Sequence, residues 1–370
     1  MAVDPKTAIA DANSIKPLEL LEGRQLIRGW SIQGRIRRSD DQTGGRFSVG
    51  YECKHDDGRK AFLKAIDLSE ALQQADPIAA LGFLADAVQC EVELLQTARR
   101  MDRVVTLLDY DFIRDLKGVP LAIPIPYIVF ERADGNARSV VRASARPPHS
   151  WCMSTLQQVA TGMSQLHRQA IAHGDLKSSN VLLFGSKGAK ISDLGRSIRQ
   201  GRNVWYENAD WAGDRAYAPP EVVYGFAHPE FNVRRLAADL FLLGSFATTL
   251  LCSATMNALI FDQLPQDFRP AILGGSYTGT FEQALPHLRT AFQAALDSVA
   301  QELPFDAPYR SNLMRMISQW CDPDPRDRGH PNTRALYAGG GNIYELERYL
   351  ASLANEAARA RSYEGRRSKP

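Results

Sequence analysis

Three short polar segments, which follow one another in a set order, constrain this chain more than any other feature. His-Gly-Asp-Leu-Lys-Ser-Ser-Asn occupies residues 173–180, Ser-Asp-Leu-Gly occupies 192–195, and Ala-Pro-Pro-Glu occupies 218–221. Any one of them alone would pass for a polar turn. Together they supply carboxylates, a lysine and an amide, which are the groups that phosphoryl transfer from ATP requires.

Four of these side chains can be given separate roles. Asp175 is placed to align the attacking hydroxyl of a substrate, and Lys177, two residues on, can reach the transferred phosphate. Asn180 and Asp193 offer the hard oxygen ligands that Mg²⁺ prefers. The tetrad therefore covers the base, the cation and the metal ligands of the reaction.

With these motifs the chain resembles the eukaryotic-like (Hanks-type) Ser/Thr protein kinases, whose signature includes a catalytic loop, a D-F-G triplet and an A-P-E triplet. Gly174 gives HGD in place of HRD, and Leu194 gives DLG in place of DFG, so the chain resembles a divergent, bacterial-type member. The resemblance covers roughly residues 25–335. It implies a bilobal α+β fold, with a small five-stranded antiparallel N-lobe that carries one helix and a larger, mainly helical C-lobe.

Alternating apolar residues agree with this architecture in the first third of the chain. A helix is predicted over 77–100, where Ala, Leu, Glu and Gln dominate. The pair Asp57 and Gly58 predicts a tight turn between the second and third strands. The strands are expected at 28–36, 45–53, 60–67, 104–111 and 126–130.

The rest of the chain has the pattern of a helical domain. Ser150 is expected to cap a helix whose buried face includes Leu156 and Met163. Further helices are predicted at 234–252, 281–301, 309–320 and 342–360. The expected domains are a leader at 1–24, the kinase N-lobe at 25–133, the kinase C-lobe at 134–352 and a basic C-terminal tail at 353–370.

The resemblance implies that the N-lobe carries the other half of an ATP site, with Mg²⁺, or alternatively Mn²⁺, as the metal. Lys64 matches the strand lysine that holds the α- and β-phosphates, and Glu91 matches the helix glutamate that holds this lysine. Glu91 is preferred to Glu93 because Leu95 then falls one turn later, where the family packs an apolar residue.

The glycine-rich loop of the family is matched only in part. Gly44 and Gly45 occupy the position of the loop, and Val49, 15 residues before Lys64, is expected over the adenine of ATP. Phe62 stands where the family usually has Ala against the adenine ring. A Phe at this position either fills the adenine pocket or stacks on the base.

The segment that joins the two lobes is assigned from the same resemblance. Phe130 is expected at the gatekeeper position, and the backbone of Glu131 and Ala133 is expected to face adenine. Asp134 and Asn136 are candidates for contacts with the ribose.

The activation segment departs from the family in two places. Gly174 removes the cation that in many members pairs with a phosphate on this segment. The segment carries arginines and carboxylates of its own, so we expect fixed ion pairs to order it. Asp214 stands where the family has Thr, and it is expected near Asp175, where it can form a salt bridge with Lys177.

Two scaffold residues also match the family. Asp239 corresponds to the helix aspartate that hydrogen-bonds the backbone of the catalytic loop, and Arg328 corresponds to the arginine that pairs with Glu221. A buried pair of the second kind is costly to break at one end.

The composition of the chain limits the kinds of partner and the compartment that we expect. A net charge of +2 provides no electrostatic case for a nucleic-acid or membrane partner. The five cysteines show no C-x-x-C pair, and the N-terminus lacks a signal-peptide pattern, so a reduced, cytoplasmic protein is expected. The expected partners are a protein substrate and, as a further candidate, a phosphatase.

Three functions remain open at this point. The first is an active Ser/Thr protein kinase, because all the charged or amide groups needed for the chemistry are present. The second is a pseudokinase that acts as a scaffold or regulatory module, motivated by Phe62, Asp214 and the incomplete glycine loop. The third is a small-molecule kinase of the aminoglycoside or choline kind, against which Lys177 and Glu221 argue.

Overall fold

The computed structural model divides the chain into two compact units. It describes residues 17–36, 48–68, 71, 74–116, 119–144, 146–202, 213–336 and 341–367. Among these, the smaller unit runs to Arg99 and resumes over Val105–Ala133, and the larger unit holds Arg100–Val104 and the chain from Asp134 onward. The division falls after Ala133, where the sequence places the end of the N-lobe, except that five residues before the fourth strand belong to the larger unit.

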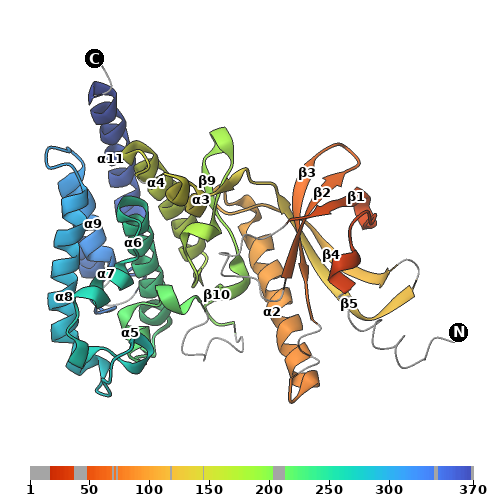
Figure 1. Ribbon diagram of the computed structural model, residues 1–370, viewed down its shortest axis with the longest axis horizontal. Helices are drawn as coiled ribbons and strands as arrows, with labels where there is room; N and C mark the ends of the chain where they lie inside the picture. Colours follow the sequence, from red (N-terminus) through yellow and green to blue (C-terminus); the bar gives the residue numbers. More distant parts are fainter. Residues whose placement is uncertain are drawn as a thin grey trace, which may run out of the picture. The chain divides into compact units, whose positions relative to one another are not determined.

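The smaller unit is built on a five-stranded antiparallel sheet, in the spatial order β1-β2-β3-β5-β4 (Figure 1). Gly58, with φ of 91°, turns the chain between the second and third strands, as the Asp-Gly pair predicts. The helix α2 (Pro77–Thr97) begins at Asp76, whose carboxylate accepts the N–H of Ala79 at 3.0 Å. The strands are β1 (Trp30–Arg35), β2 (Ser48–His55), β3 (Lys60–Ile66), β4 (Leu107–Leu116) and β5 (Val119–Glu131).

The end of the predicted leader belongs to this unit, so the leader boundary at residue 24 is wrong. Leu18 and Leu21 are buried in the core beneath one face of the sheet, together with Tyr51 and Leu63. The backbone N–H of Gly23 donates to the carbonyl of Ile32 in β1 at 2.9 Å. Buried apolar side chains hold this segment on the sheet, and an ion pair between Arg24 and Asp115 at 3.1 Å adds to them.

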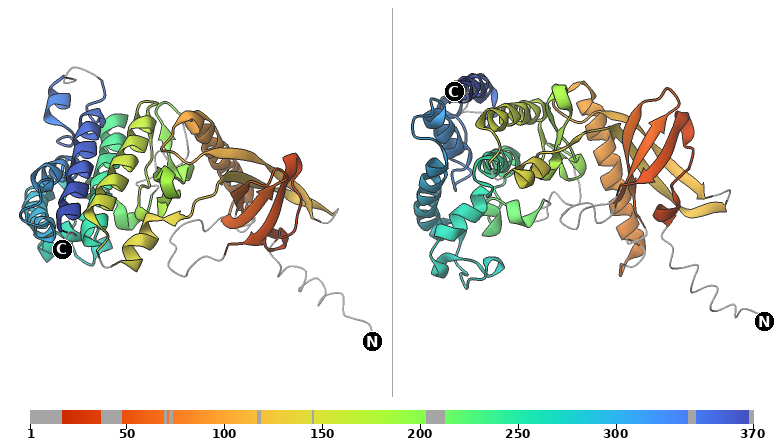
Figure 2. Two further views of the ribbon diagram at one scale, coloured as in Figure 1. Left: turned by 90° about the horizontal axis from the view of Figure 1, so that it is seen from above. Right: turned by 45° about the horizontal axis from the view of Figure 1, so that its top comes forward.

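The larger unit is mainly helical, and Figure 2 shows its helices from two further sides. Two small sheets carry its loops, β6-β8-β9 and β7-β10. Its elements are β6 (Gly135–Asn136), α3 (Ala137–Ala143), α4 (His149–His167), β7 (Ile171–Ala172), β8 (Val181–Leu183), β9 (Ala189–Ile191), β10 (Ile198–Arg199), α5 (Pro220–Val223), α6 (Ala237–Cys252), α7 (Met256–Gln263), α8 (Phe281–Glu302), α9 (Arg310–Trp320), α10 (Pro331–Leu336) and α11 (Glu347–Arg367).

The helix α6 forms the centre of the larger unit. A π-helical turn, Asn232–Leu236, leads into it. The joined stretch Asn232–Cys252 is long and apolar enough to span a membrane, but 94% of its most apolar window is buried inside the protein. Burial of this kind is that of a core helix.

Two expectations for the larger unit are corrected. The segment expected as a basic tail from residue 353 is the second half of α11, which packs on α4. Leu353 and Ala360 are buried there, because the helix presents an apolar stripe to its neighbour. The cap of α4 is Pro148 rather than Ser150, which lies inside the helix.

Candidate functional site

The backbone of the loop that carries the first motif is fixed by one buried carboxylate. Asp239, at the start of α6, accepts the backbone N–H of His173 at 2.7 Å and that of Gly174 at 2.9 Å. The Nε2 atom of His167 lies 2.9 Å from the same carboxylate, a contact that the sequence did not indicate. Asp239 is fully buried, so it fixes the loop backbone without access to solvent.

Glycine at position 174 has a conformational reason. Its φ is +74°, and a Cβ added there would lie 3.0 Å from the carbonyl oxygen of Arg196. The hydroxyl of Ser197 donates to the carbonyl of His173 at 3.0 Å. The hydroxyl of Ser197 is therefore buried and hydrogen-bonded within the fold. Tyr206, which carries another hydroxyl of the activation segment, lies outside the described residues.

Asp175 lies at the centre of a buried charged network. Lys177 Nζ is 3.1 Å from Asp175 Oδ2 and 3.3 Å from Asp214 Oδ2, and the backbone N–H of Asp214 donates to Asp175 Oδ1 at 2.9 Å. Burial raises the pKa of Asp175, although Lys177 and the Asp214 N–H act in the opposite direction. Burial also disfavours charged Lys177, but the two carboxylates outweigh it and raise its pKa.

The predicted metal ligands lie on the same loop and on the D-L-G segment. The side-chain amide of Asn180 donates to the carbonyl of Asp175 at 2.8 Å and to its carboxylate at 3.2 Å, which fixes how Asn180 is turned. Asp193 has a left-handed backbone, with φ of 62°. Among the described residues there is no group of three or more His, Cys, Asp or Glu suited to a metal. An amide oxygen and one carboxylate fit Mg²⁺, which keeps few protein ligands when phosphates supply the others.

The third motif is anchored by a wholly buried ion pair. Arg328 Nη1 and Nη2 lie 2.7 and 2.6 Å from the two carboxylate oxygens of Glu221. The remaining guanidinium N–H groups donate to the carbonyls of Asp322, Ala237 and Pro323. The structure thus brings together the two residues that the sequence assigned to each other.

In the smaller unit, the structure brings Lys64 and Glu91 together. Lys64 Nζ lies 2.8 and 3.0 Å from the two carboxylate oxygens of Glu91. Glu93, the second choice, instead accepts the side-chain amide of Gln89 at 3.1 Å. The lysine side chain is 20% exposed, whereas that of Glu91 is 5% exposed. The pair therefore has a buried anchor and a cation that reaches the surface of the unit.

The assignment of Val49 to the adenine is contradicted by the strand register. Val49 pairs with Ala65 and packs on the hydrophobic core, whereas Gly50 pairs with Lys64. Neighbouring residues of a strand point to opposite faces, so Gly50 shares the face of Lys64 and Val49 does not. Counting 15 residues back along the chain did not predict this register. Gly44 and Gly45 lie outside the described residues.

The end of β5 is held by two hydrogen bonds between Glu131 and Thr106. Glu131 donates its N–H to the carbonyl of Thr106 at 3.2 Å, and its carboxylate accepts the N–H of Thr106 at 2.8 Å. Ala133 follows at the end of the smaller unit. In the larger unit, the side chain of Asn136 caps α3 by accepting the N–H of Ser139 at 2.9 Å, so its expected contact with a ribose is replaced by a structural one.

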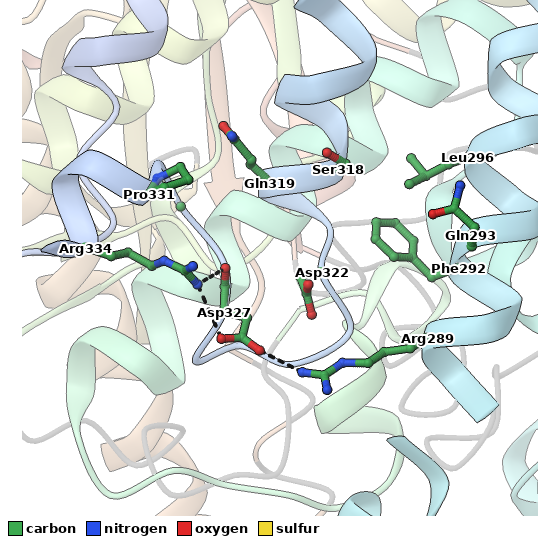
Figure 3. A pocket seen from close by; sticks show the side chains of 11 residues that line it. Arg289, Phe292, Gln293, Leu296, Ser318, Gln319, Asp322, Asp327, Pro331 and Arg334 are labelled. Carbon is green, nitrogen blue, oxygen red and sulfur yellow. Dashed lines mark hydrogen bonds and ion pairs between the residues drawn. The ribbon is translucent and has the colours of Figure 1, made fainter. Parts of the chain in front are cut away.

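A pocket of about 590 Å³ in the larger unit lies away from these motifs (Figure 3). Its described lining contains none of the predicted site residues. Arg289 and Arg334 both reach Asp327 there, with N–O distances of 2.7 and 3.4 Å. The two arginines of this pocket are therefore paired with Asp327, whereas the carboxylate of Asp322 accepts the backbone N–H of Asp324 at 2.9 Å.

Comparison with known proteins agrees with the site. The family model described as "Protein kinase domain" matches residues 42–332. Human mitogen-activated protein kinase kinase kinase 3 is 27% identical over 199 residues, which are 53% of this chain and 30% of that protein. Serine/threonine protein kinase OSK3 of Oryza sativa subsp. indica is 28% identical over 195 residues, 50% of this chain and 35% of that protein. The matched region thus spans about a third of the length of each relative.

The fold and the three motifs define a bilobal protein kinase, and the family match covers well over half of the chain. This chain belongs to the protein kinase family. Sequence reasoning missed two residues of the site. Gly50 could have been noticed because a Gly in a strand marks close approach of another group, but nothing in the sequence pointed to His167.

Proposed function

We propose that this protein is an active kinase that transfers the γ-phosphoryl group of Mg-ATP to Ser or Thr hydroxyls of a protein substrate. The observation that carries the proposal is the position of Asp175. Its Oδ1 accepts the Asp214 N–H, and its Oδ2 lies 3.1 Å from Lys177 Nζ and 3.2 Å from the Asn180 amide. A carboxylate held in this way is preorganised for proton transfer.

The chain's own residues account for the steps of the reaction. The substrate hydroxyl attacks the γ-phosphorus, the bond to the β–γ bridging oxygen breaks, and the proton goes to the carboxylate of Asp175. The raised pKa of Asp175 makes it a stronger base than an ordinary carboxylate. Lys177 contributes positive charge beside Asp175, where the hydroxyl attacks the γ-phosphorus, and Lys64, held by Glu91, binds the α- and β-phosphates.

Asn180 and Asp193 would hold the divalent cation. When bound, the cation would supply positive charge that offsets the negative charge developing on the phosphates. The orientation of Asn180 supports this role, because its amide N–H groups are used by Asp175.

A protein acceptor is favoured over a small molecule by the third motif. The buried pair of Glu221 and Arg328 fixes an A-P-P-E segment of the kind that protein kinases carry and small-molecule kinases usually lack. The names of relatives such as Serine/threonine protein kinase OSK3 favour Ser and Thr as acceptors.

Phosphoryl transfer tests the proposal directly. The purified protein is incubated with γ-labelled ATP, Mg²⁺ and a generic protein acceptor, beside Asp175→Asn and Asp193→Asn. Asn tolerates the left-handed backbone of residue 193, so this variant removes charge without straining the chain. The exposed Asp267→Asn is the matched control. We expect label transfer in the wild type and the control, and its loss in both other variants.

Two outcomes contradict the proposal. Absence of both transfer and ATP-induced thermal stabilisation in the wild type favours a pseudokinase scaffold. Transfer only to small hydroxylated acceptors, tested as a panel in the same assay, favours a small-molecule kinase.

A further inference from the structure

One face of the small sheet carries an aromatic ring beside the lysine of the proposed ATP site. In β3, Ala61, Leu63 and Ala65 are fully buried in the core, so the alternation of the strand places Phe62 and Lys64 together on the opposite face. Two residues along a strand span roughly 7 Å. The ring of Phe62 is only partly buried and thus lies within reach of a nucleotide whose phosphates are held by Lys64.

The ring occupies space that a missing side chain leaves open. A Cβ added to Gly50 would lie 2.7 Å from Cε2 and 3.0 Å from Cζ of Phe62. Gly50 sits opposite Lys64 in the neighbouring strand β2 and has no positive φ that would require glycine. Glycine is therefore required at position 50 because a larger side chain there would collide with the ring of Phe62.

A second aromatic residue limits the ring from the other side. Phe130 of β5 pairs directly with Phe62 in the sheet, and the two ring centroids are 6.3 Å apart at an interplanar angle of 35°. Phe130 is 7% exposed, so it is a fixed support. With Gly50 on one side and Phe130 on the other, Phe62 is a positioned ring, and ordering it on ligand binding costs little entropy.

We propose that Phe62 is the residue on which the nucleobase of the bound nucleotide stacks, and that Gly50 is the positioning residue that makes room for its ring. The inference rests on the proposed function and answers the alternative left open by the sequence, in which Phe62 blocks the site. Stacking acts on the π-face that every base has, so Phe62 stabilises adenine and guanine nucleotides to a similar extent.

Nucleotide affinity tests the pair of residues. Dissociation constants of ADP, GDP and inorganic tripolyphosphate, each with Mg²⁺, are measured by calorimetry for Phe62→Ala, Phe62→Leu, Phe62→Tyr, Gly50→Val and the double variant Gly50→Val/Phe62→Ala. Phe112→Ala, which removes a 43%-exposed ring from β4 of the same sheet, is the matched control. Urea unfolding of every variant verifies that it is folded.

We expect Phe62→Ala to weaken ADP and GDP by about tenfold each, the size of a lost base–aromatic stack, and to leave tripolyphosphate within about twofold. Phe62→Leu should behave like Phe62→Ala, and Phe62→Tyr should retain the affinity of the wild type. Gly50→Val should weaken ADP because the new side chain displaces the ring. In the Phe62→Ala background the same change should cause no further loss, so the two effects are not additive.

The contrary results separate this inference from the proposed function. If the wild type binds ADP and transfers phosphate while Phe62→Ala binds ADP as well as the wild type does, stacking is wrong and the kinase proposal stands. If ADP binds only after Phe62 is removed, Phe62 blocks the site, and both proposals are wrong. Equal weakening of tripolyphosphate and ADP by Phe62→Ala would also overturn the inference, because the ring would then act on the phosphate side.

Discussion

Each unit contains one ion pair that the family resemblance assigns, and the two pairs are built differently. In the smaller unit Lys64 meets Glu91 at 2.8 Å, with a lysine side chain that is 20% exposed. In the larger unit Arg328 meets Glu221 at 2.6 Å, with an arginine that is fully buried. All five N–H donors of this arginine are used. Two of them donate to Glu221, and the other three donate to the backbone carbonyls of Asp322, Ala237 and Pro323.

The difference shows how the same charge chemistry can serve a ligand or the fold. A lysine is a compact point charge that can turn toward a phosphate, whereas a guanidinium with its donors satisfied has a fixed geometry. The Lys64 pair should therefore matter for phosphoryl transfer, and the Arg328 pair should matter for stability.

The largest effect is expected for Arg328→Met. The change leaves Glu221 buried and uncompensated, so the free energy of unfolding should fall by about 3–5 kcal/mol. Urea denaturation measures it. Arg289→Met, which breaks a half-exposed pair with Asp327, is the control and should cost less than about 1 kcal/mol. If the two variants lose equal free energy of unfolding, the proposed difference between a buried and a half-exposed ion pair is wrong.

Lys64→Met is expected to lower the rate of phosphoryl transfer more than it lowers stability. The rate of phosphoryl transfer is expected to fall roughly a hundredfold to a thousandfold, as when one preorganised electrostatic contact to the reacting phosphates is lost. The free energy of unfolding should fall by less than in Arg328→Met, because Lys64 is 20% exposed whereas Arg328 is fully buried, although Glu91 loses this partner in the variant. Lys60→Met, an exposed lysine on the same strand, should retain full activity. A stability loss comparable to that of Arg328→Met would contradict the functional interpretation.

Two glycine changes sharpen the comparison between the units. Gly174→Ala should destabilise the larger unit by about 1–2 kcal/mol, because its φ is +74°. Gly82→Ala in α2 meets nothing within 4 Å and should stabilise the protein by roughly 0.5–1 kcal/mol. Thermal unfolding measures both. Stabilisation by Gly174→Ala would show that the loop does not need this backbone conformation.

The smallest effect is expected for Asp214→Asn. Lys177 keeps its contact with Asp175, so the loss of one partly exposed carboxylate should cost about 1 kcal/mol or less. Urea unfolding beside Asp267→Asn measures the difference. A loss as large as that of Arg328→Met would place Asp214 among the residues that hold the fold.

Much of the site was open to prediction because its chemistry is local. Asp175, Lys177 and Asn180 lie within six residues, so the loop that joins them sets their distances. The pair of Lys64 and Glu91 was implied by the resemblance to the protein kinases, and the structure brings the two side chains together. The prediction for Val49 is wrong because a shift of one residue in register moves a side chain to the other face.

Other differences come from packing partners that a local pattern does not name. Residues 17–24 and the second half of α11 were expected to lie outside the domain, but Leu21 and Leu353 are fully buried. Each segment has an apolar stripe, which is stable only when a second surface removes it from water. Asn136 was expected at a ribose and instead caps α3, because a side chain next to a helix start satisfies free backbone N–H groups.

The sequence by itself determined the class of fold and the residue types of the proposed phosphoryl-transfer site, because the three motifs carry the resemblance to the protein kinases, and its apolar periodicity indicated the main strands and helices. Only the tertiary structure decided that Gly50 faces Lys64, that Phe62 lies over Gly50 and that His167 contacts Asp239. These contacts join residues far apart in the chain, and strand register and packing create them.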